Sequence, residues 1–334
     1  MKNSLEKRIN KALKGLLLIF PISLIVYFLL SDINGNKNLL TTSQDLYKEI
    51  FYGIILISTG YVLRYWRWRM ILSMFQFSPP KNLESRLWLA SYSFTTTPGK
   101  VGELIRCFFL RKVFNIPLKY SLVSILLERF YDLLTVLFIT ITFSFLNLKK
   151  YIFNISLYTF WLFFVAIIFF KIIRSNKPKI LKFIRLLAGK LFFKKLGMPM
   201  NSQSINWNSF LNFKIIWKLF ALSIFSWSLE GLAFYLILSK SNIPLNFLQA
   251  TFIHTSAGLL GILTMMPGGI GSTEAITITM FKYLEIPFEI SFPITSLIRL
   301  MTIWYITVLG LFSFLTVQKT IFNESKTPKK FKNI

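Results

Sequence analysis

The chain has 334 residues, of which 54% are hydrophobic and 17% aromatic, and its formal net charge is +26. The apolar runs are too numerous for one buried core, which excludes an ordinary soluble domain and predicts an integral membrane protein. The basic residues lie between apolar runs, where they act as topology and anionic-lipid signals, so nucleic acid is not expected as a partner. A single cysteine and a single histidine exclude an intrachain disulfide and a His/Cys metal cluster, and no cofactor is expected.

The first predicted elements are a basic segment at 1–14 and two spans at 16–30 and 50–66, joined by a less positive connection. The second span leads into the sequence RYWRWR at 64–69, in which arginines and aromatics alternate. This pattern is typical of an interfacial aromatic belt with cations that reach toward the headgroups. A specific lipid-headgroup site is the alternative interpretation.

A helix break is predicted next, where an apolar segment with Ser and Thr at 87–97 leads into Pro98, Gly99 and Gly102. Proline cannot continue a helix, and glycine permits turn geometries that other residues avoid. Lipid cannot satisfy free backbone groups, so a break at membrane depth must be buried in protein or line a wet cavity. Glu103 and Arg106 follow the break directly.

The predicted span at 119–146 contains Glu128, Arg129 and Asp132. Glu128 and Asp132 share a helix face because they are four residues apart, and Arg129 lies beside that face. A charge at mid-bilayer costs about 2.5–3.5 kcal/mol even on the lenient insertion scale, so these side chains should face a polar interior and pair. An arginine–carboxylate lock between helices and a substrate-binding role are both compatible with the pattern.

The middle of the chain holds a plain span at 152–173, a basic amphipathic segment at 171–195 and a span at 213–238 with Glu230 inside it. The lone Glu230 carboxylate is expected to find a partner or to stay protonated. His254 lies in the next run, 245–266, where a hydrogen-bonded packing role is favoured over proton relay.

A second break follows at Pro267, Gly268, Gly269 and Gly271, and a helix is predicted to restart near Ser272 with Glu274 in its first turn. A helix N-terminus presents unpaired N–H groups that suit an anion such as phosphate. The alternative is a glycine-rich loop between two ordinary spans. A short helix at 274–284, a last span at 292–317 and a basic tail complete the chain.

The two breaks match in order and spacing, and each precedes an apolar span that carries an arginine, Arg129 or Arg299. Paired Gly/Pro-interrupted segments indicate an internal repeat with the binding site at its interface. Three single spans lie between the breaks, and this odd number inverts the second copy. The prediction is an all-α membrane protein with about six single spans and two Pro-Gly-broken helix pairs in an inverted repeat.

These elements are expected to form one membrane domain at 1–320, with repeat halves at about 50–146 and 213–317 and a basic cytoplasmic tail at 321–334. The distribution of lysine and arginine places both termini in the cytoplasm. The expected location is the cytoplasmic membrane.

Four motifs together resemble the lysylphosphatidylglycerol synthase transmembrane-region family: RYWRW at 64–68, TPGKVGELIR at 97–106, ERFYD at 128–132 and PGGIGSTE at 267–274. The resemblance implies flipping of an aminoacylated phospholipid, and some members are fused to soluble aminoacyl-transferase or glycosyltransferase domains. This sequence ends shortly after its last predicted span, so synthase activity is not expected.

The leading hypothesis is a flippase for an anionic or aminoacylated phospholipid or a lipid-linked glycan precursor. The headgroup phosphate would sit at a helix N-terminus, arginines would supply counter-charge, and carboxylates would hold the arginines or meet a cationic headgroup. A membrane-embedded enzyme or an accessory subunit of envelope biosynthesis is the alternative; a second copy of the chain or an envelope-biosynthesis enzyme is a candidate partner. The candidate substrate-binding residues are Pro98, Gly99, Gly102, Glu103, Arg106, Glu128, Arg129, Asp132, Pro267, Gly268, Gly269, Gly271, Glu274 and Arg299.

Overall fold

The computed structural model describes residues 44–97, 101–146, 212–241 and 243–323, and these residues form helices and no strand. Three helical segments are long and apolar enough to cross a membrane: Leu46–Met74, Phe213–Lys240 and Phe288–Gln318. The all-α membrane class is therefore confirmed. The predicted spans at 16–30 and 152–173, the basic segment and most of the tail lie outside the described residues, so the number of spans, the domain limits and the tail stay predictions.

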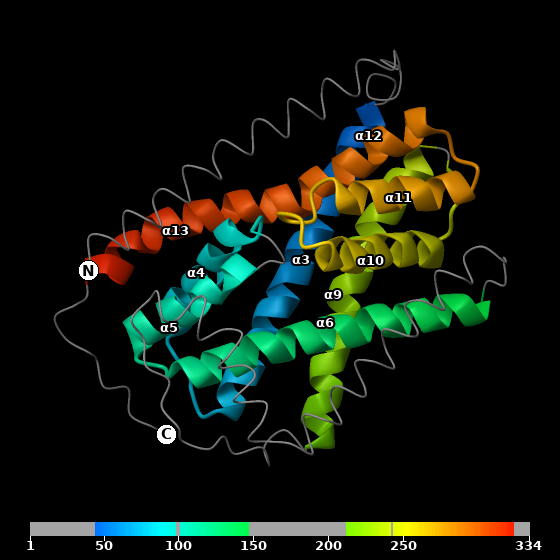
Figure 1. The fold of residues 1–334 in the computed structure, drawn as a ribbon. Coiled ribbons are helices and arrows are strands. Elements are labelled where there is room, and N and C mark those ends of the chain that lie inside the picture. Colours follow the sequence, from blue (N-terminus) through cyan, green and yellow to red (C-terminus); the bar gives the residue numbers. More distant parts are fainter. Residues whose placement is uncertain (1–43, 98–100, 147–211, 242, 324–334) are drawn as a thin grey trace.

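The described helices follow the same order twice (Figure 1). Each half has a long helix, a shorter helix before the break, a short helix after it and a final helical segment. The first half contains α3 (Gln44–Met74), α4 (Lys81–Ala90), η1 (Ser91–Phe94), η2 (Val101–Leu104), α5 (Ile105–Phe114) and α6 (Leu118–Leu146). The second contains α9 (Phe213–Lys240), α10 (Phe247–Leu263), α11 (Ser272–Tyr283), α12 (Phe288–Arg299), η5 (Leu300–Trp304) and α13 (Tyr305–Asn323).

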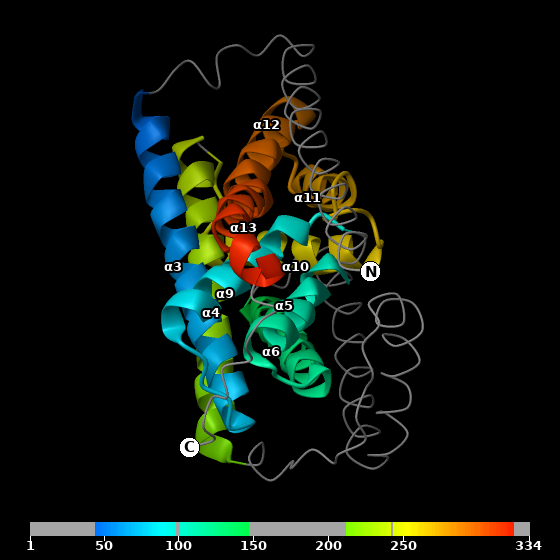
Figure 2. The same cartoon turned by 90° about the vertical axis from the view of Figure 1, so that its left-hand side faces the viewer.

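The two long helices, α3 and α9, lie side by side and run antiparallel (Figure 2). Gly53 lies opposite Ala233, and Gly60 lies opposite Ser226, whose hydroxyl donates to the Gly60 carbonyl over 3.1 Å. Small residues at such a seam let two backbones approach closely. The final segments, α6 and α12–α13, also run in opposite directions (Figure 1). Corresponding elements are therefore inverted, as the sequence predicted.

The halves interlock, because each packs its pre-break helix on the final segment of the other. The first half packs α4 and η1 on α13, and the second packs α10 on α6. Ser313 donates to the Arg86 carbonyl over 2.7 Å, and Phe143 stacks on Phe252 with ring centroids 4.3 Å apart. The space between the halves is therefore enclosed by both.

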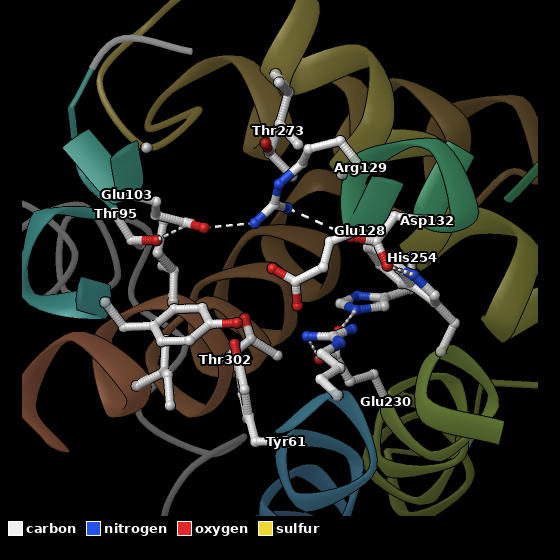
Figure 3. A pocket seen from close by; sticks show the side chains of 18 of the residues that line it. Tyr61, Thr95, Glu103, Glu128, Arg129, Asp132, Glu230, His254, Thr273 and Thr302 are labelled. Atoms are coloured by element: carbon white, nitrogen blue, oxygen red, sulfur yellow. Dashed lines mark hydrogen bonds and ion pairs between the residues drawn. The ribbon is translucent and has the colours of Figure 1, made fainter. Parts of the chain in front are cut away.

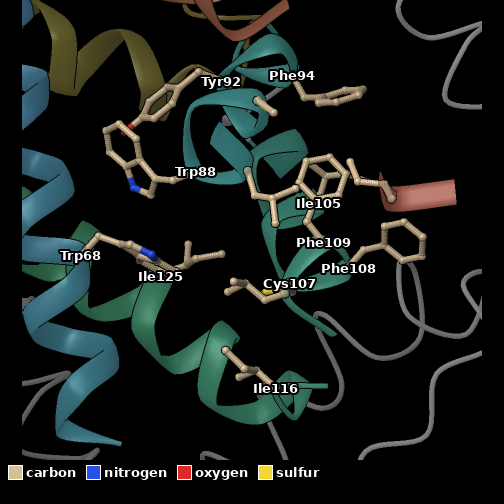
Figure 4. Packing of buried hydrophobic residues seen from close by; sticks show 14 of the residues in the cluster. Trp68, Trp88, Tyr92, Phe94, Ile105, Cys107, Phe108, Phe109, Ile116 and Ile125 are labelled. Carbon is tan, nitrogen blue, oxygen red and sulfur yellow. The ribbon is translucent and has the colours of Figure 1, made fainter. Parts of the chain in front are cut away.

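An apolar cluster fills the first half between α3, α4, α5, α6 and α13 (Figure 4). Trp68, Trp88, Phe109 and Phe314 are almost fully buried in it. Large aromatic side chains contribute much of the apolar area that such a core removes from water. This cluster also surrounds the Arg106 guanidinium, which is described below.

The last predicted span is a continuous helical segment interrupted by one π-helical turn. Pro293 lies inside α12, and η5 is the π-helical turn that separates α12 from α13. Single π turns inside α-helices often occur at functional sites. This one begins directly after Arg299 and brings Thr302 and Ile303 to the cavity described below.

The second break requires left-handed backbone at four positions, Met265, Gly268, Gly269 and Gly271, and α11 then begins at Ser272 as predicted. Gly268 has φ +61°, and a Cβ built on it would lie 2.9 Å from Ile303 Cδ1 and 3.2 Å from Thr96 Cα. Glycine is therefore favoured at 268 both by its conformation and by the available space.

Gly268→Ala is expected to lower the free energy of unfolding by about 1–2 kcal/mol, the cost of a left-handed conformation in a residue with a Cβ. Gly258→Ala is the matched control, because Gly258 is helical with open space around its Cβ position, and it should be neutral or stabilising. Thermal unfolding of both variants in detergent measures the difference. Equal midpoints would contradict the proposed strain.

Candidate functional site

A cavity of about 70 Å³ lies between the two halves (Figure 3). It is lined by α3, the end of η1, η2 and α6 from the first half and by α9, α10, α11 and the α12–α13 segment from the second. The charged residues that line it are Arg64, Arg67, Glu103, Glu128, Arg129, Asp132, Glu230 and Arg299.

Arg129 extends from α6 across this cavity (Figure 3). It forms an ion pair with Glu103 and a longer contact of 3.4 Å with Asp132. The Thr95 hydroxyl donates to the same Glu103 carboxylate. With 38% of its side chain exposed, Arg129 is the most accessible of the four cavity arginines. It is therefore the cation that an entering ligand meets with the least rearrangement.

Behind the cavity, Arg106 of α5 pairs with Glu128 of α6 at 2.6 Å. Both side chains are about 1–2% exposed. The Arg106 guanidinium carbon lies 4.6 Å from the centre of the Trp68 ring, and its Nε donates to the Ser91 hydroxyl over 3.0 Å. The arginine–carboxylate lock between helices that the sequence indicated is present here, with Arg106 in place of Arg129 as the partner of Glu128.

The second half repeats this arrangement. Arg299 Nε donates to Glu274 over 2.9 Å, and Arg299 Nη2 donates to the Gly268 carbonyl over 2.8 Å. In each half, an arginine of the final helical segment thus pairs with a carboxylate just after the break. The pairs Arg129–Glu103 and Arg299–Glu274 are equivalent in the two halves.

Arg64 and Arg67 belong to the cavity, which corrects their interpretation as aromatic-belt residues. The helix α3 continues to Met74, so both arginines lie within it with 11% and 2% of their side chains exposed. Arg67 pairs with Asp132 at 2.8 Å. Trp66, at 56% exposure, does face outward. The three-residue spacing of the two arginines is the signal that could have placed them on one helix face.

Arg69 differs from its two neighbours, because it pairs with Glu84 of α4 outside this cavity. Trp68 Nε1 also donates to Glu84 over 3.1 Å. Burial raises the pKa of Glu84 to about 7, although the Arg69 guanidinium acts in the opposite direction. The RYWRWR motif therefore separates into two cavity arginines and one that fixes α4 to α3.

Glu230 has partners in the structure, which is one of the two outcomes expected for its carboxylate. One carboxylate oxygen lies 2.7 Å from Arg64 Nη1, and the other lies 3.2 Å from His254 Nε2. The indole of Trp227 stands next to His254, with ring centroids 6.4 Å apart. Four cavity residues are not among the predicted site residues, because their partners come from other helices: Arg64, Arg67, Glu230 and His254.

The structure brings six of the predicted site residues to the cavity: Glu103, Glu128, Arg129, Asp132, Gly268 and Arg299. Arg106 and Glu274 lie one layer behind as ion-pair partners. Pro267, Gly269 and Gly271 form the turn before α11, and Pro98 and Gly99 fall outside the described residues. The Gly102 N–H already donates to the Thr97 hydroxyl over 2.6 Å. A phosphate at the helix N-termini stays a prediction.

Three buried nitrogen atoms of the cavity arginines have no hydrogen-bond partner among the described residues: Arg64 Nε, Arg64 Nη2 and Arg67 Nε. Leaving a buried donor unpaired costs about 1–3 kcal/mol, and more for a charged group. An anion with several acceptor oxygens, or ordered water, would remove this cost. The arrangement is thus suited to bind an oxyanion.

The cavity is small compared with the roughly 300–1,000 Å³ of ordinary ligand pockets. At about 10–15 Å³ per water measured in the same way, 70 Å³ accommodates a few waters or the charged end of a headgroup. Acyl chains do not fit in it. A lipid ligand would therefore place its headgroup here only while its chains stay outside or the helices separate.

Comparison with known proteins gives a consistent result. The profile of the lysylphosphatidylglycerol synthase transmembrane region matches residues 13–310. A UPF0104 membrane protein of Methanocaldococcus jannaschii is 26% identical over 238 residues, which cover 70% of this chain and 97% of the relative. A second from the same organism is 24% identical over 319 residues, covering 91% and 93% of the two chains. A UPF0104 membrane protein of Methanothermobacter thermautotrophicus is 32% identical over 102 residues, 30% of each chain.

Proposed function

The chain belongs to the lysylphosphatidylglycerol synthase transmembrane-region family, and we propose that it moves a lipid with a charged headgroup between the leaflets of the cytoplasmic membrane. The substrate class is an anionic or aminoacylated phospholipid or a lipid-linked glycan precursor. The family name connects the chain to membrane lipids. Transport, and the direction of the termini toward the cytoplasm, are our proposal.

One observation carries the proposal: buried arginine N–H groups that find no acceptor in the described part of the chain line a cavity between two inverted halves. Substrate sites of many transporters lie at the interface of inverted repeats, where broken helices meet. A phosphodiester offers acceptor oxygens that match the fork of an arginine. The cavity therefore has both the chemistry and the location expected of a headgroup site.

In this mechanism the headgroup enters beside Arg129, the accessible cation, and replaces Glu103 or Asp132 as its partner. The equivalent pair Arg299–Glu274 in the inverted half performs the same exchange from the other side. Alternating access then consists of opening one half while the other stays closed. The acyl chains remain in the bilayer throughout.

We further propose that the chain is not an enzyme. Each carboxylate that lines the cavity contacts an arginine: Glu103, Glu128, Asp132 and Glu230. A general base must lie within hydrogen-bond reach of the proton that it abstracts, whereas these carboxylates direct their oxygens at guanidinium groups of the protein. An enzyme would turn over substrate alone in detergent, whereas a flippase needs two leaflets.

Arg64→Gln tests the proposal in proteoliposomes with fluorescent phosphatidylglycerol and fluorescent lysylphosphatidylglycerol. The wild type should exchange lipid between leaflets faster than protein-free vesicles. The variant should lose about tenfold or more, because hydrogen bonds to charged groups are worth about 1.5–3 kcal/mol.

Arg86→Gln is the matched control, since Arg86 is exposed on α4 outside the cavity and should retain wild-type exchange. No acceleration of either lipid by correctly inserted wild-type protein would overturn the proposal. Equal loss in both variants would assign the effect to general damage and contradict the placement of the site.

A further inference from the structure

The charges around the cavity balance. Within the described residues, the network contains the arginines 64, 67, 106, 129 and 299 and the carboxylates Glu103, Glu128, Asp132, Glu230 and Glu274, five of each sign. His254 is the remaining titratable member of the ion-pair network and is uncharged when it carries one ring proton. The site is thus neutral before a ligand enters, although it is rich in arginine.

An anionic headgroup would give the neutral site a net negative charge. A single phosphodiester brings one negative charge into a cavity of about 70 Å³ that has room for only a few waters, and an uncompensated charge there is costly. One added proton would restore the balance. A zwitterionic headgroup brings no net charge and needs no such proton.

His254 is the group placed to accept that proton. The carboxylates are held by arginines, whereas His254 Nε2 lies 3.2 Å from a Glu230 oxygen. Protonation makes this contact a charge-assisted hydrogen bond. Glu230 also holds Arg64, so a protonated His254 competes for the same carboxylate and makes the Arg64 guanidinium more available to the ligand.

The surroundings of His254 support this role. Its helix, α10, packs on α9, α6 and α11. The charged groups that face the cavity from these helices are Glu230 on α9 and the Glu128, Arg129 and Asp132 set on α6, while α11 contributes the neutral Thr273. Arg64 and Arg67 complete the set from α3. His254 itself lines the cavity that would hold the headgroup.

We propose that His254 binds one proton when a singly anionic lipid headgroup occupies the cavity, so that proton and anionic lipid are coupled ligands. This inference rests on the proposed function for its physiological meaning. Linkage makes the coupling reciprocal: the proton strengthens anion binding by the factor by which the anion strengthens proton binding. Transport of an anionic lipid would then carry a proton with it.

The chain has one histidine, which permits a direct test. The full-length protein, purified with a histidine-free affinity tag, is labelled with ¹⁵N-histidine and placed in nanodiscs of phosphatidylcholine. The ring ¹⁵N shifts report the protonation state of His254 alone, across pH 5–8 where histidine changes charge. Phosphatidylglycerol or phosphatidylethanolamine is then added to the nanodiscs.

Phosphatidylglycerol is expected to raise the titration midpoint of His254 by about one pH unit, a tenfold change in proton affinity. Phosphatidylethanolamine should leave it unchanged. Anionic lipids also lower the pH at the membrane surface, so Arg64→Gln in the same nanodiscs is the control: it keeps the surface potential and removes a ligand-binding cation. A shift of equal size in this variant, or no shift in the wild type, overturns the proposal.

Exchange measurements separate this inference from the proposed function. In proteoliposomes, exchange of phosphatidylglycerol by the wild type should respond to a pH gradient, and exchange by His254→Gln should not. A ¹⁵N shift without any lipid exchange would support coupled binding and overturn transport. Lipid exchange without any change in the ¹⁵N titration of His254 would support transport and overturn the coupling.

Discussion

Replacing Arg106 by methionine is expected to lower the free energy of unfolding by about 3–5 kcal/mol, the cost of breaking a buried ion pair. The change leaves the Glu128 carboxylate buried without its 2.6 Å partner. It also removes a cation that lies over the rings of Trp68 and Trp88. Chemical or thermal unfolding in detergent, followed by tryptophan fluorescence, measures the loss.

The double variant Arg106→Met/Glu128→Leu should recover most of that loss, because a buried ion pair replaced by apolar groups leaves no unpaired charge. Arg111→Met is the matched control on the same helix, since Arg111 is exposed and should change stability little. A single variant as stable as this control would contradict the account. So would a double variant no more stable than Arg106→Met alone, because the pair would then not act as a unit.

The repeat was predictable because its signals are local. Proline and glycine restrict the backbone wherever they occur, so the break at 267–271 and the helix start at Ser272 follow from the residues themselves. Arg129 and Arg299 lie 31 and 32 residues after Pro98 and Pro267, and this similar spacing also indicated that the two arginines hold equivalent places. The structure confirms this by pairing each with a carboxylate just after its break.

Partners across helices could not be predicted in the same way. The carboxylate that pairs with Arg64 is determined by how α3 packs on α9. No local sequence pattern predicts that packing. The RYWRWR motif was misinterpreted because alternating arginine and aromatic residues are typical of the end of a span at a membrane interface. This composition does not reveal whether the helix ends at the motif or continues beyond it. The actual end of α3 at Met74 moves Arg64 and Arg67 into the protein.

The ion pairs of Arg106 and Arg129 differ in burial, and we expect them to differ in function. Arg106 is buried behind the cavity over the ring of Trp68, and its pair with Glu128 fixes α5 on α6. Arg129 keeps 38% of its side chain exposed and shares two carboxylates, so its partners can change without exposing a core. Stability and ligand exchange are therefore assigned to neighbouring residues on α6, which makes them separable by mutation.

Arg129→Ala and Arg299→Ala are expected to slow lipid exchange by about a hundredfold or more, because each removes a guanidinium that would donate two hydrogen bonds to the headgroup phosphate, each worth about 1.5–3 kcal/mol. Their effects on stability should differ. Arg129 is the more exposed, whereas Arg299 is 11% exposed and also holds the Gly268 carbonyl of the break. Arg299→Ala should therefore lower the unfolding midpoint more than Arg129→Ala.

Lysine at either position separates charge from geometry, since it keeps the cation and loses the planar fork that can hold two oxygens at once. Exchange by Arg129→Lys should lie between that of the wild type and that of Arg129→Ala. Because the two halves are inverted copies, alternating access requires both arginines in turn. If one alanine variant, correctly folded and inserted, exchanged lipid at the wild-type rate, only the other half would act on the headgroup, and the symmetric mechanism would be wrong.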